Sequence, residues 1–191
     1  MTTYLPKNGN EMPSSSSRLT LATVWLDGCS GCHMSMLDMD EYLLEILNRA
    51  DLVYSPLVDR KDFPNMVDIT LVEGAVSSVH DLEKIMHIRE HTRVLVSLGD
   101  CAVTGNVPSM RNLFSTADVL KRAYVETSDV NATPPTVMIP KLLARVRPVH
   151  QVVPVDVVVP GCPPSAQIIA YVLDRLIAGE PVDLGENARF G

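Results

Sequence analysis

The chain has 191 residues, of which 46% are hydrophobic and 20% are charged, as in an ordinary soluble protein with a full core. Its 23 acidic and 16 basic side chains give a net charge of −7. No stretch concentrates lysine and arginine as a phosphate-binding face requires, so the composition argues against nucleic acid as a partner.

The N-terminal segment 1–17, MTTYLPKNGNEMPSSSS, is polar and rich in serine. It has neither an apolar core nor a twin-arginine pair, so we interpret it as a flexible tail and not as an export signal, and we expect a cytoplasmic protein. No uncharged apolar run approaches the ~20 residues that cross a bilayer, so no membrane span is expected. Residues 18–191 are then predicted to form a single α/β domain.

Hydrophobic periodicity predicts strands and helices that alternate along the chain. The predicted elements are strand 19–26, helix 35–50, strands 52–58 and 67–72, helix 78–91, strands 94–98 and 152–159, and helix 165–178. Ser78 with Asp81 three residues later forms a capping-type helix start. Such alternation predicts a mostly parallel sheet covered on both faces, a doubly wound α/β sandwich of the flavodoxin-like type.

Between Tyr124 and Gln151 this pattern fails, because several prolines interrupt the segment. We expect at most one helical turn there, at 141–145. So long an irregular stretch in a compact domain is either a binding surface or a wandering surface loop.

The four cysteines each follow a predicted strand. Cys29 and Cys32 follow the first strand, Cys101 follows strand 94–98, and Cys162 follows strand 152–159. Because parallel strands end at one edge of a sheet, where doubly wound folds bind ligands, we expect the four sulfurs to converge. Independent buried cysteines would share no such location.

Four thiolates at one site suit either an iron-sulfur cluster or a zinc ion. The local sequences GCSGC, GDC and GCPP favour the cluster, because glycine lets the backbone approach a bulky group and direct amides at its sulfurs. Structural zinc sites usually draw their ligands from two paired knuckles, and this chain has one CxxC pair.

From about Leu19 to Gly179 the chain resembles the small subunits of nickel-iron hydrogenases, a family similar to the cluster-bearing subunit of respiratory complex I. The segments DGCSGCHMS, VEGAVSS, SLGDCAVTGNVPSMR and VVPGCPPSAQ carry the resemblance. It implies that the four cysteines bind one 4Fe-4S cluster. Complex I homologues have two adjacent cysteines where this chain has Cys29 and Cys32, so the spacing favours a hydrogenase.

Within that family the chain is most similar to the small subunits of cytoplasmic, NAD-reducing bidirectional hydrogenases. The resemblance implies a partner large subunit that contains the nickel-iron centre, and diaphorase subunits with further clusters and a flavin. It also implies an electron relay in a hydrogen:NAD oxidoreductase, with hydrogen split in the partner. The resemblance leaves NADP and other carriers open as acceptors beside NAD.

Other residues near the predicted site are weaker candidates. Glu73 ends a strand at the cysteine-bearing edge, where it either relays protons near the cluster or is a solvated acid. His33 either tunes the cluster or the interface, or is an ordinary core histidine. We do not expect FMN, although the fold raises the question, because cysteines occupy the turn where a phosphate-binding loop would lie.

Two alternative functions remain open from the sequence. One is the small subunit of another cytoplasmic hydrogenase or of a complex-I-like oxidoreductase. The other, from a different class, is a zinc-stabilised binding module without electron transfer.

Overall fold

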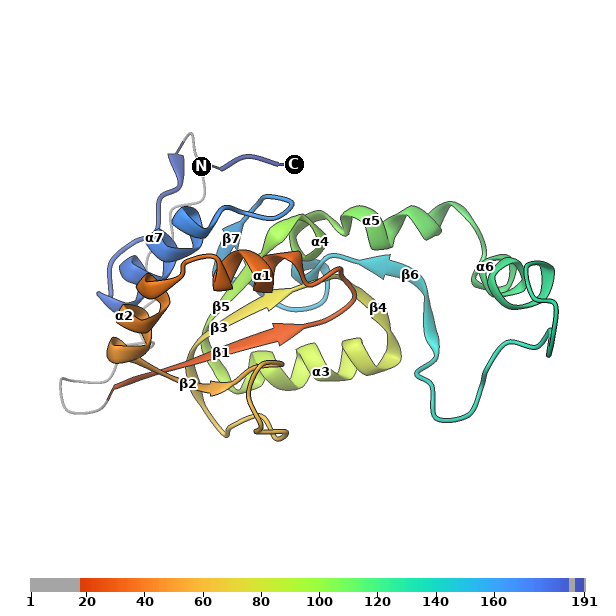
Figure 1. Cartoon of the computed structure of the whole chain (residues 1–191), viewed down its shortest axis with the longest axis horizontal. Coiled ribbons are helices and arrows are strands. Elements are labelled where there is room, and N and C mark those ends of the chain that lie inside the picture. Colours follow the sequence, from red (N-terminus) through yellow and green to blue (C-terminus); the bar gives the residue numbers. More distant parts are fainter. Residues whose placement is uncertain (1–17, 186–187, 191) are drawn as a thin grey trace.

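The computed structural model describes residues 18–185 and 188–190, so the tail predicted at 1–17 lies outside the described residues. Five parallel strands form the central sheet (Figure 1). Their order across the sheet is β2 (Ala50–Tyr54), β1 (Leu19–Trp25), β3 (Val67–Glu73), β5 (Thr92–Leu98) and β7 (Val157–Val159). Counted along the chain this is the 2-1-3-4-5 order of flavodoxin-like folds, so the predicted fold class is confirmed.

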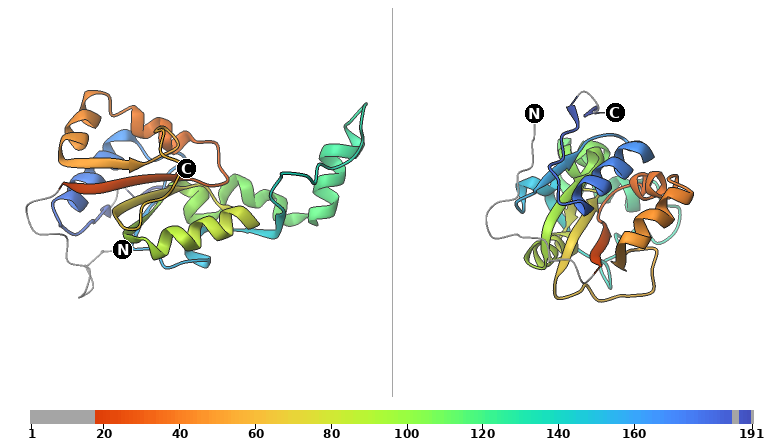
Figure 2. Two further views of the ribbon diagram at one scale, coloured as in Figure 1. Left: turned by 90° about the horizontal axis from the view of Figure 1, so that it is seen from below. Right: turned by 90° about the vertical axis from the view of Figure 1, so that its left-hand side faces the viewer.

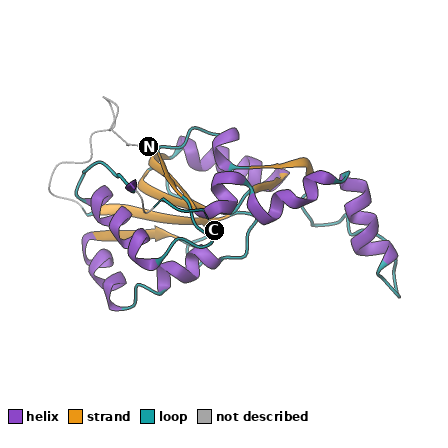
Figure 3. Ribbon diagram, turned by 90° about the horizontal axis from the view of Figure 1, so that it is seen from above, coloured by secondary structure: helices purple, strands orange, loops and turns teal. Residues whose placement is uncertain are grey.

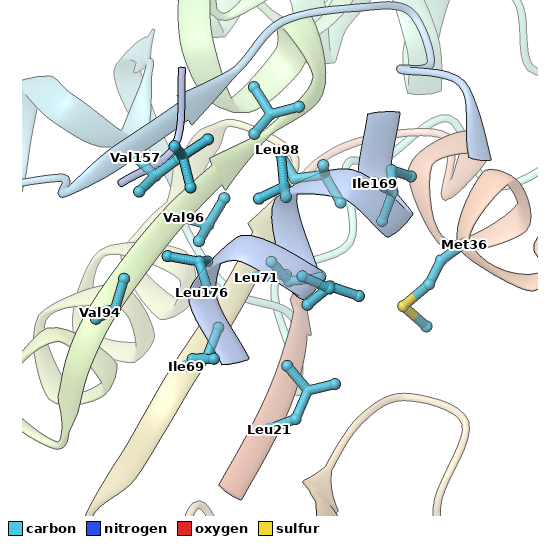
Figure 4. Packing of buried hydrophobic residues seen from close by; sticks show 14 of the residues in the cluster. Leu21, Met36, Ile69, Leu71, Val94, Val96, Leu98, Val157, Ile169 and Leu176 are labelled. Carbon is cyan, nitrogen blue, oxygen red and sulfur yellow. The ribbon is translucent and has the colours of Figure 1, made fainter. Parts of the chain in front are cut away.

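Helices cover both faces of the sheet (Figure 3). One face carries α1 (Gly31–Leu37), α2 (Glu41–Arg49) and α7 (Ala166–Ile177), and the other carries α3 (Val79–Glu90) and α4 (Gly99–Thr104). Successive residues of a strand point to opposite faces, and β5 shows this alternation. Val94, Val96 and Leu98 pack under α7 (Figure 4). Leu95, in contrast, packs in the core on the side of α3.

Helices α3 and α7 begin where the sequence predicts. At the start of α3, the Ser78 side chain accepts a hydrogen bond from the Asp81 backbone and the Asp81 carboxylate accepts one from Ser78 N, which completes a capping box. Ser165 caps α7 in a similar way through Ile168 N. No helix in the described part of the chain has the length and apolar character needed to cross a bilayer.

The helix predicted at 35–50 is two helices in the structure. The chain breaks between α1 and α2 at residues 38–40, where Asp40 adopts a positive φ of 51°. With a ψ of −126° this backbone conformation lies outside the helical region, so the helix cannot continue through residue 40. The break turns α2 along the edge of the sheet, next to α7.

The prediction of a helical turn at 141–145 is wrong. Residues Leu142–Arg147 form β6, which pairs antiparallel with β4 (Val76–Ser78). Pairing with a strand far away in the sequence overrides the local preference of the segment. The strand predicted at 152–159 is also shortened to β7, after a 3-10 turn at Val149–Gln151.

An arm extends from the body between α4 and β6 (Figures 1 and 2). It contains α5 (Asn106–Ser109), the 3-10 turn η1 (Met110–Leu113), α6 (Thr116–Lys121), the π-helical turn η2 (Arg122–Glu126) and a segment 127–141 without helix or strand. Asn112 holds the base of the arm, because its side chain bonds to both the N–H and the carbonyl of Val146. Of the irregular stretch predicted between Tyr124 and Gln151, residues 124–141 form the outer part of this arm, whereas the later residues form β6 and the 3-10 turn.

Candidate functional site

The structure places all four cysteines at the carboxyl edge of the sheet. Cys29 and Cys32 follow β1, with Cys32 in the first turn of α1, while Cys101 lies in α4 directly after β5. Cys162 lies in the loop between β7 and α7, and all four are free thiols. The placement at strand ends that the sequence predicts is therefore present in the structure, and the convergence of the four sulfurs on one point stays a prediction.

The thiols influence one another electrostatically. Burial raises the pKa of Cys32, and the Glu73 carboxylate and the thiols of the other three cysteines raise it further. Burial likewise raises the pKa of Cys101 to about 11, with Cys162 and Cys29 adding to the shift. Without a nearby cation Cys32 and Cys101 stay protonated at neutral pH. Four thiols at one edge are a donor set that suits a positively charged metal group, which deprotonates the thiols that coordinate it.

Glycines next to the cysteines permit one close approach between segments, at Gly99, and one tight local turn, at Gly161. Gly99 has a φ of 80°, and a Cβ atom at this position would lie 2.2 Å from the Sγ of Cys32. Gly161 has a φ of 135°, and a Cβ atom there would lie 2.6 Å from Pro164 N. Any other residue at either position would clash and strain the backbone. The predicted approach of these glycines to a cluster stays a prediction.

Asp100 joins the Cys101 and Cys162 segments. Its backbone N–H donates to the Gly161 carbonyl at 2.9 Å, and its side-chain Oδ1 accepts from Gly161 N at 2.7 Å. The aspartate is 4% exposed, so both bonds are shielded from water. Sequence reasoning missed this residue, although an acid directly between a buried strand and a cysteine was an available signal.

Three of the sulfurs receive N–H donors. Gly31 N donates to Cys29 Sγ at 3.4 Å, and the Asn106 side-chain Nδ2 donates to Cys162 Sγ at 3.4 Å. The backbone N–H of Val107 bonds to Cys101 and lowers its pKa, against the larger effect of burial. The predicted role of backbone amides near the site thus has local support, whereas Asn106 was not anticipated.

Glu73 is buried, so the alternative of a solvated strand-end acid is wrong. Its Oε2 accepts a hydrogen bond from His33 N at 2.7 Å, and His33 Nδ1 lies 2.9 Å from the same oxygen at an angle that makes no hydrogen bond. On the far side of the ring, Nε2 lies 2.9 Å from Thr23 Oγ1, which donates to Ser55 Oγ at 2.8 Å. A buried polar chain therefore leads from the helix that carries Cys32 to the end of β2.

The described residues contain no cluster of ligand side chains that could hold a single metal ion. Across 18–185 and 188–190, no group of three or more His, Cys, Asp or Glu side chains is arranged to hold one metal ion.

Of the methionines near the cysteines, Met36 and Met39 belong to the core, and Met34 is exposed.

The fold and the four-cysteine edge define a flavodoxin-like subunit of the kind found in hydrogenases and in complex I. Residues 29–176 match the family model of the NADH ubiquinone oxidoreductase 20 Kd subunit. The chain belongs to this family, whose members of the hydrogenase small-subunit and complex I types carry an iron-sulfur cluster.

Individual relatives point to hydrogenases. The delta subunit of the NAD-reducing hydrogenase HoxS of Cupriavidus necator is 43% identical, over 87% of this chain and 82% of the relative. A subunit of the F420-non-reducing hydrogenase of Methanothermobacter marburgensis is 36% identical, over 87% of this chain and 56% of the relative. The chain thus spans most of the first relative but little more than half of the second.

Solved structures agree with these relatives. A chain of an NAD+-reducing [NiFe]-hydrogenase in the H2-reduced state superimposes with a TM-score of 0.87 and 34% identity, over 92% of this chain and 100% of that chain. A [NiFeSe]-hydrogenase chain of Dm. baculatum gives a TM-score of 0.56 at 16% identity, which shows a shared fold alone. The chain is therefore homologous to the small subunit of NAD-reducing [NiFe] hydrogenase, and a role in electron transfer is consistent with its family.

Proposed function

We propose that this chain is the electron-transferring small subunit of an NAD-reducing [NiFe] hydrogenase, and that Cys29, Cys32, Cys101 and Cys162 bind one 4Fe-4S cluster. The observation that carries the proposal is the placement of these cysteines after β1, β5 and β7 at one edge of a parallel sheet. The homology to NAD-reducing hydrogenase subunits supports the same conclusion.

The surroundings of the cysteines suit a cluster. When bound, the cluster would accept and release one electron at a time. The cysteines would hold it, Gly99 and Gly161 leave room beside them, and Asp100 fixes the two distant segments relative to each other. Partial burial of Cys32 and Cys101 would exclude part of the water, and the N–H donors and Glu73 would set the local charge balance.

The partners follow from the relatives and from the cysteine count. The chain has four cysteines, all assigned to the cluster, so none remains to hold nickel and iron. We therefore place the nickel-iron centre and the splitting of hydrogen in a large subunit. Electrons would pass from there through this chain to diaphorase subunits with iron-sulfur clusters and a flavin, and on to NAD, or in reverse when protons are reduced.

The proposal also covers the domain organisation, the cellular location and the absence of a flavin from this subunit. Residues 18–191 form one iron-sulfur domain, and the assembly works in the cytoplasm. The turn after β1 carries Cys29 and Cys32 in place of a phosphate-binding loop, which argues against FMN in this subunit.

A second candidate is the small subunit of a cytoplasmic hydrogenase that serves a different acceptor. It is favoured by the 36% identity to an F420-non-reducing hydrogenase subunit, although the chain spans only 56% of that relative. A zinc-stabilised module is the candidate from another class, and metal analysis distinguishes it, because a zinc site would hold one zinc ion per chain whereas a cluster would contain iron and sulfide.

The test is anaerobic purification of the chain together with the subunits that bind it, followed by assay of hydrogen-dependent NAD and NADP reduction. The proposal expects NAD reduction that is lost when Cys101 is changed to serine while the complex stays assembled. Reduction of another carrier in place of NAD would select the second candidate. A complex without hydrogen oxidation would refute both.

A further inference from the structure

Asn106 differs from the other donors at the cysteines, because it acts through its side chain. Gly31 and Val107 use backbone N–H groups, which every residue except proline would supply at those positions. Asn106 reaches Cys162, 56 residues away in the sequence, with its amide Nδ2 at 3.4 Å from the sulfur. This contact therefore depends on the identity of one side chain.

The backbone at this position does not by itself require asparagine. Asn106 has a positive φ of 27° and follows Gly105, whose φ is 87°. Glycine adopts such conformations with the least strain, and asparagine tolerates them. Backbone geometry would thus be satisfied by glycine, and the hydrogen bond to Cys162 is what the asparagine side chain adds.

We propose that the Asn106 side-chain amide raises the reduction potential of the cluster by donating a hydrogen bond to the Sγ of Cys162. This inference rests on the proposed function, in which Cys162 is a cluster ligand. Reduction adds one negative charge that is spread over the iron and sulfur atoms. An N–H dipole directed at a sulfur stabilises that charge, so it favours the reduced form over the oxidised form.

The electrostatic surroundings of Cys162 and Cys32 differ. Cys162 is exposed and receives the Asn106 amide, whereas Cys32 is half-buried and lies in the field of the Glu73 carboxylate. A negative charge near one ligand disfavours reduction, and a donor at another favours it. Asn106 therefore counteracts Glu73, and its removal shifts the balance toward the oxidised form.

The test is a potentiometric titration of the cluster followed by electron paramagnetic resonance, on the full chain purified anaerobically with its bound subunits. Asn106→Gly removes the donor and keeps a residue suited to a positive φ. Asn106→Asp replaces the donor with an anionic acceptor of similar size. Asn131→Gly is the matched control, because Asn131 also has a positive φ, 56°, and lies exposed on the arm.

We expect Asn106→Gly to lower the equilibrium constant for one-electron reduction between about threefold and tenfold, tenfold being about 59 mV. Asn106→Asp should lower it further, and Asn131→Gly should leave it unchanged. An unchanged or raised potential in both Asn106 variants would overturn the inference. So would loss of the cluster from both, since Asn106 would then be needed for assembly.

These outcomes are separate from a failure of the proposed function. If the unmodified chain contained no iron-sulfur signal, the function itself would be wrong, and the inference would fall with it. If the unmodified chain had the cluster and the Asn106 variants kept its potential, the function would stand and only the inference would be refuted.

Discussion

The sulfur of Cys32 lies directly against Gly99, so closely that a Cβ atom at position 99 would come within 2.2 Å of it. This relationship brings the CxxC pair after β1 to the turn that leads into Cys101. Both segments can occupy the same edge only because residue 99 has no side chain and adopts a φ of 80°.

The first prediction concerns this contact. We expect Gly99→Ala to reduce the iron content of the purified chain severalfold, because a methyl group would displace Cys32 and strain the turn. Iron and acid-labile sulfide per chain provide the measurement. Gly179→Ala is the control, since Gly179 also has a positive φ, 69°, but a Cβ atom there meets nothing within 4 Å. Equal iron loss in both variants would show that backbone strain, and not contact with Cys32, is responsible.

The second prediction tests Glu73 as a proton relay beside the cluster. Glu73→Gln keeps an oxygen that can accept from His33 N but removes the ionisable group. We expect hydrogen-dependent turnover to fall about 100-fold, the low end of general acid–base effects, with an altered pH profile. Glu45→Gln on the exposed face of α2 is the control. Unchanged turnover and pH dependence in Glu73→Gln would remove the relay.

The third prediction follows from the raised pKa of Cys101. In the metal-free chain this thiol, with a pKa of about 11, should react slowly with iodoacetamide at pH 8 and faster as the pH approaches 11, because the thiolate is the nucleophile. The pKa of Cys101 in the folded chain lies above the ordinary thiol value of 9.0, so the protonated thiol stabilises the folded state. This contribution to the free energy of unfolding is complete below pH 9 and is lost as the pH rises toward 11. Mass spectrometry of alkylated peptides and denaturant unfolding at several pH values measure the two effects. Fast alkylation of Cys101 at pH 8 in the folded chain would contradict the prediction.

The fourth prediction concerns the start of α3. Ser78→Ala breaks the capping box with Asp81 and should lower the free energy of unfolding by about 1 kcal/mol. Urea denaturation followed by circular dichroism measures the change. Ser128→Ala provides a comparison, because Ser128 lies on the arm and bonds to the nearby Val130 carbonyl in an exposed position. If both substitutions had the same effect, the capping box would contribute nothing specific.

The parts of the fold that can be predicted are those set by local pattern. The predicted bounds of β3 and β5 agree with the structure to within two residues, because central strands of a parallel sheet are nearly continuous apolar runs. The start of α3 is predictable because a capping box lies within four residues of sequence. The shared location of the cysteines follows from a rule of topology and needs no knowledge of individual contacts.

The parts that could not be predicted depend on contacts between distant residues. Strand β6 forms because it pairs with β4, more than 60 residues earlier, and nothing in its own sequence demands a strand. The burial of Glu73 depends on His33 N, which is 40 residues away. The Asn106 contact with Cys162 is similar, although the Gly105-Asn106 pair does indicate a turn.

The central claim is that the four cysteines together bind one 4Fe-4S cluster, and metal analysis of the anaerobically purified chain tests it most directly. The account predicts a brown protein with about four iron and four sulfide per chain, together with a paramagnetic signal on reduction. Changing any one of Cys29, Cys32, Cys101 or Cys162 to serine should diminish both. A colourless chain with one zinc ion, or iron that is retained in all four serine variants, would contradict the account.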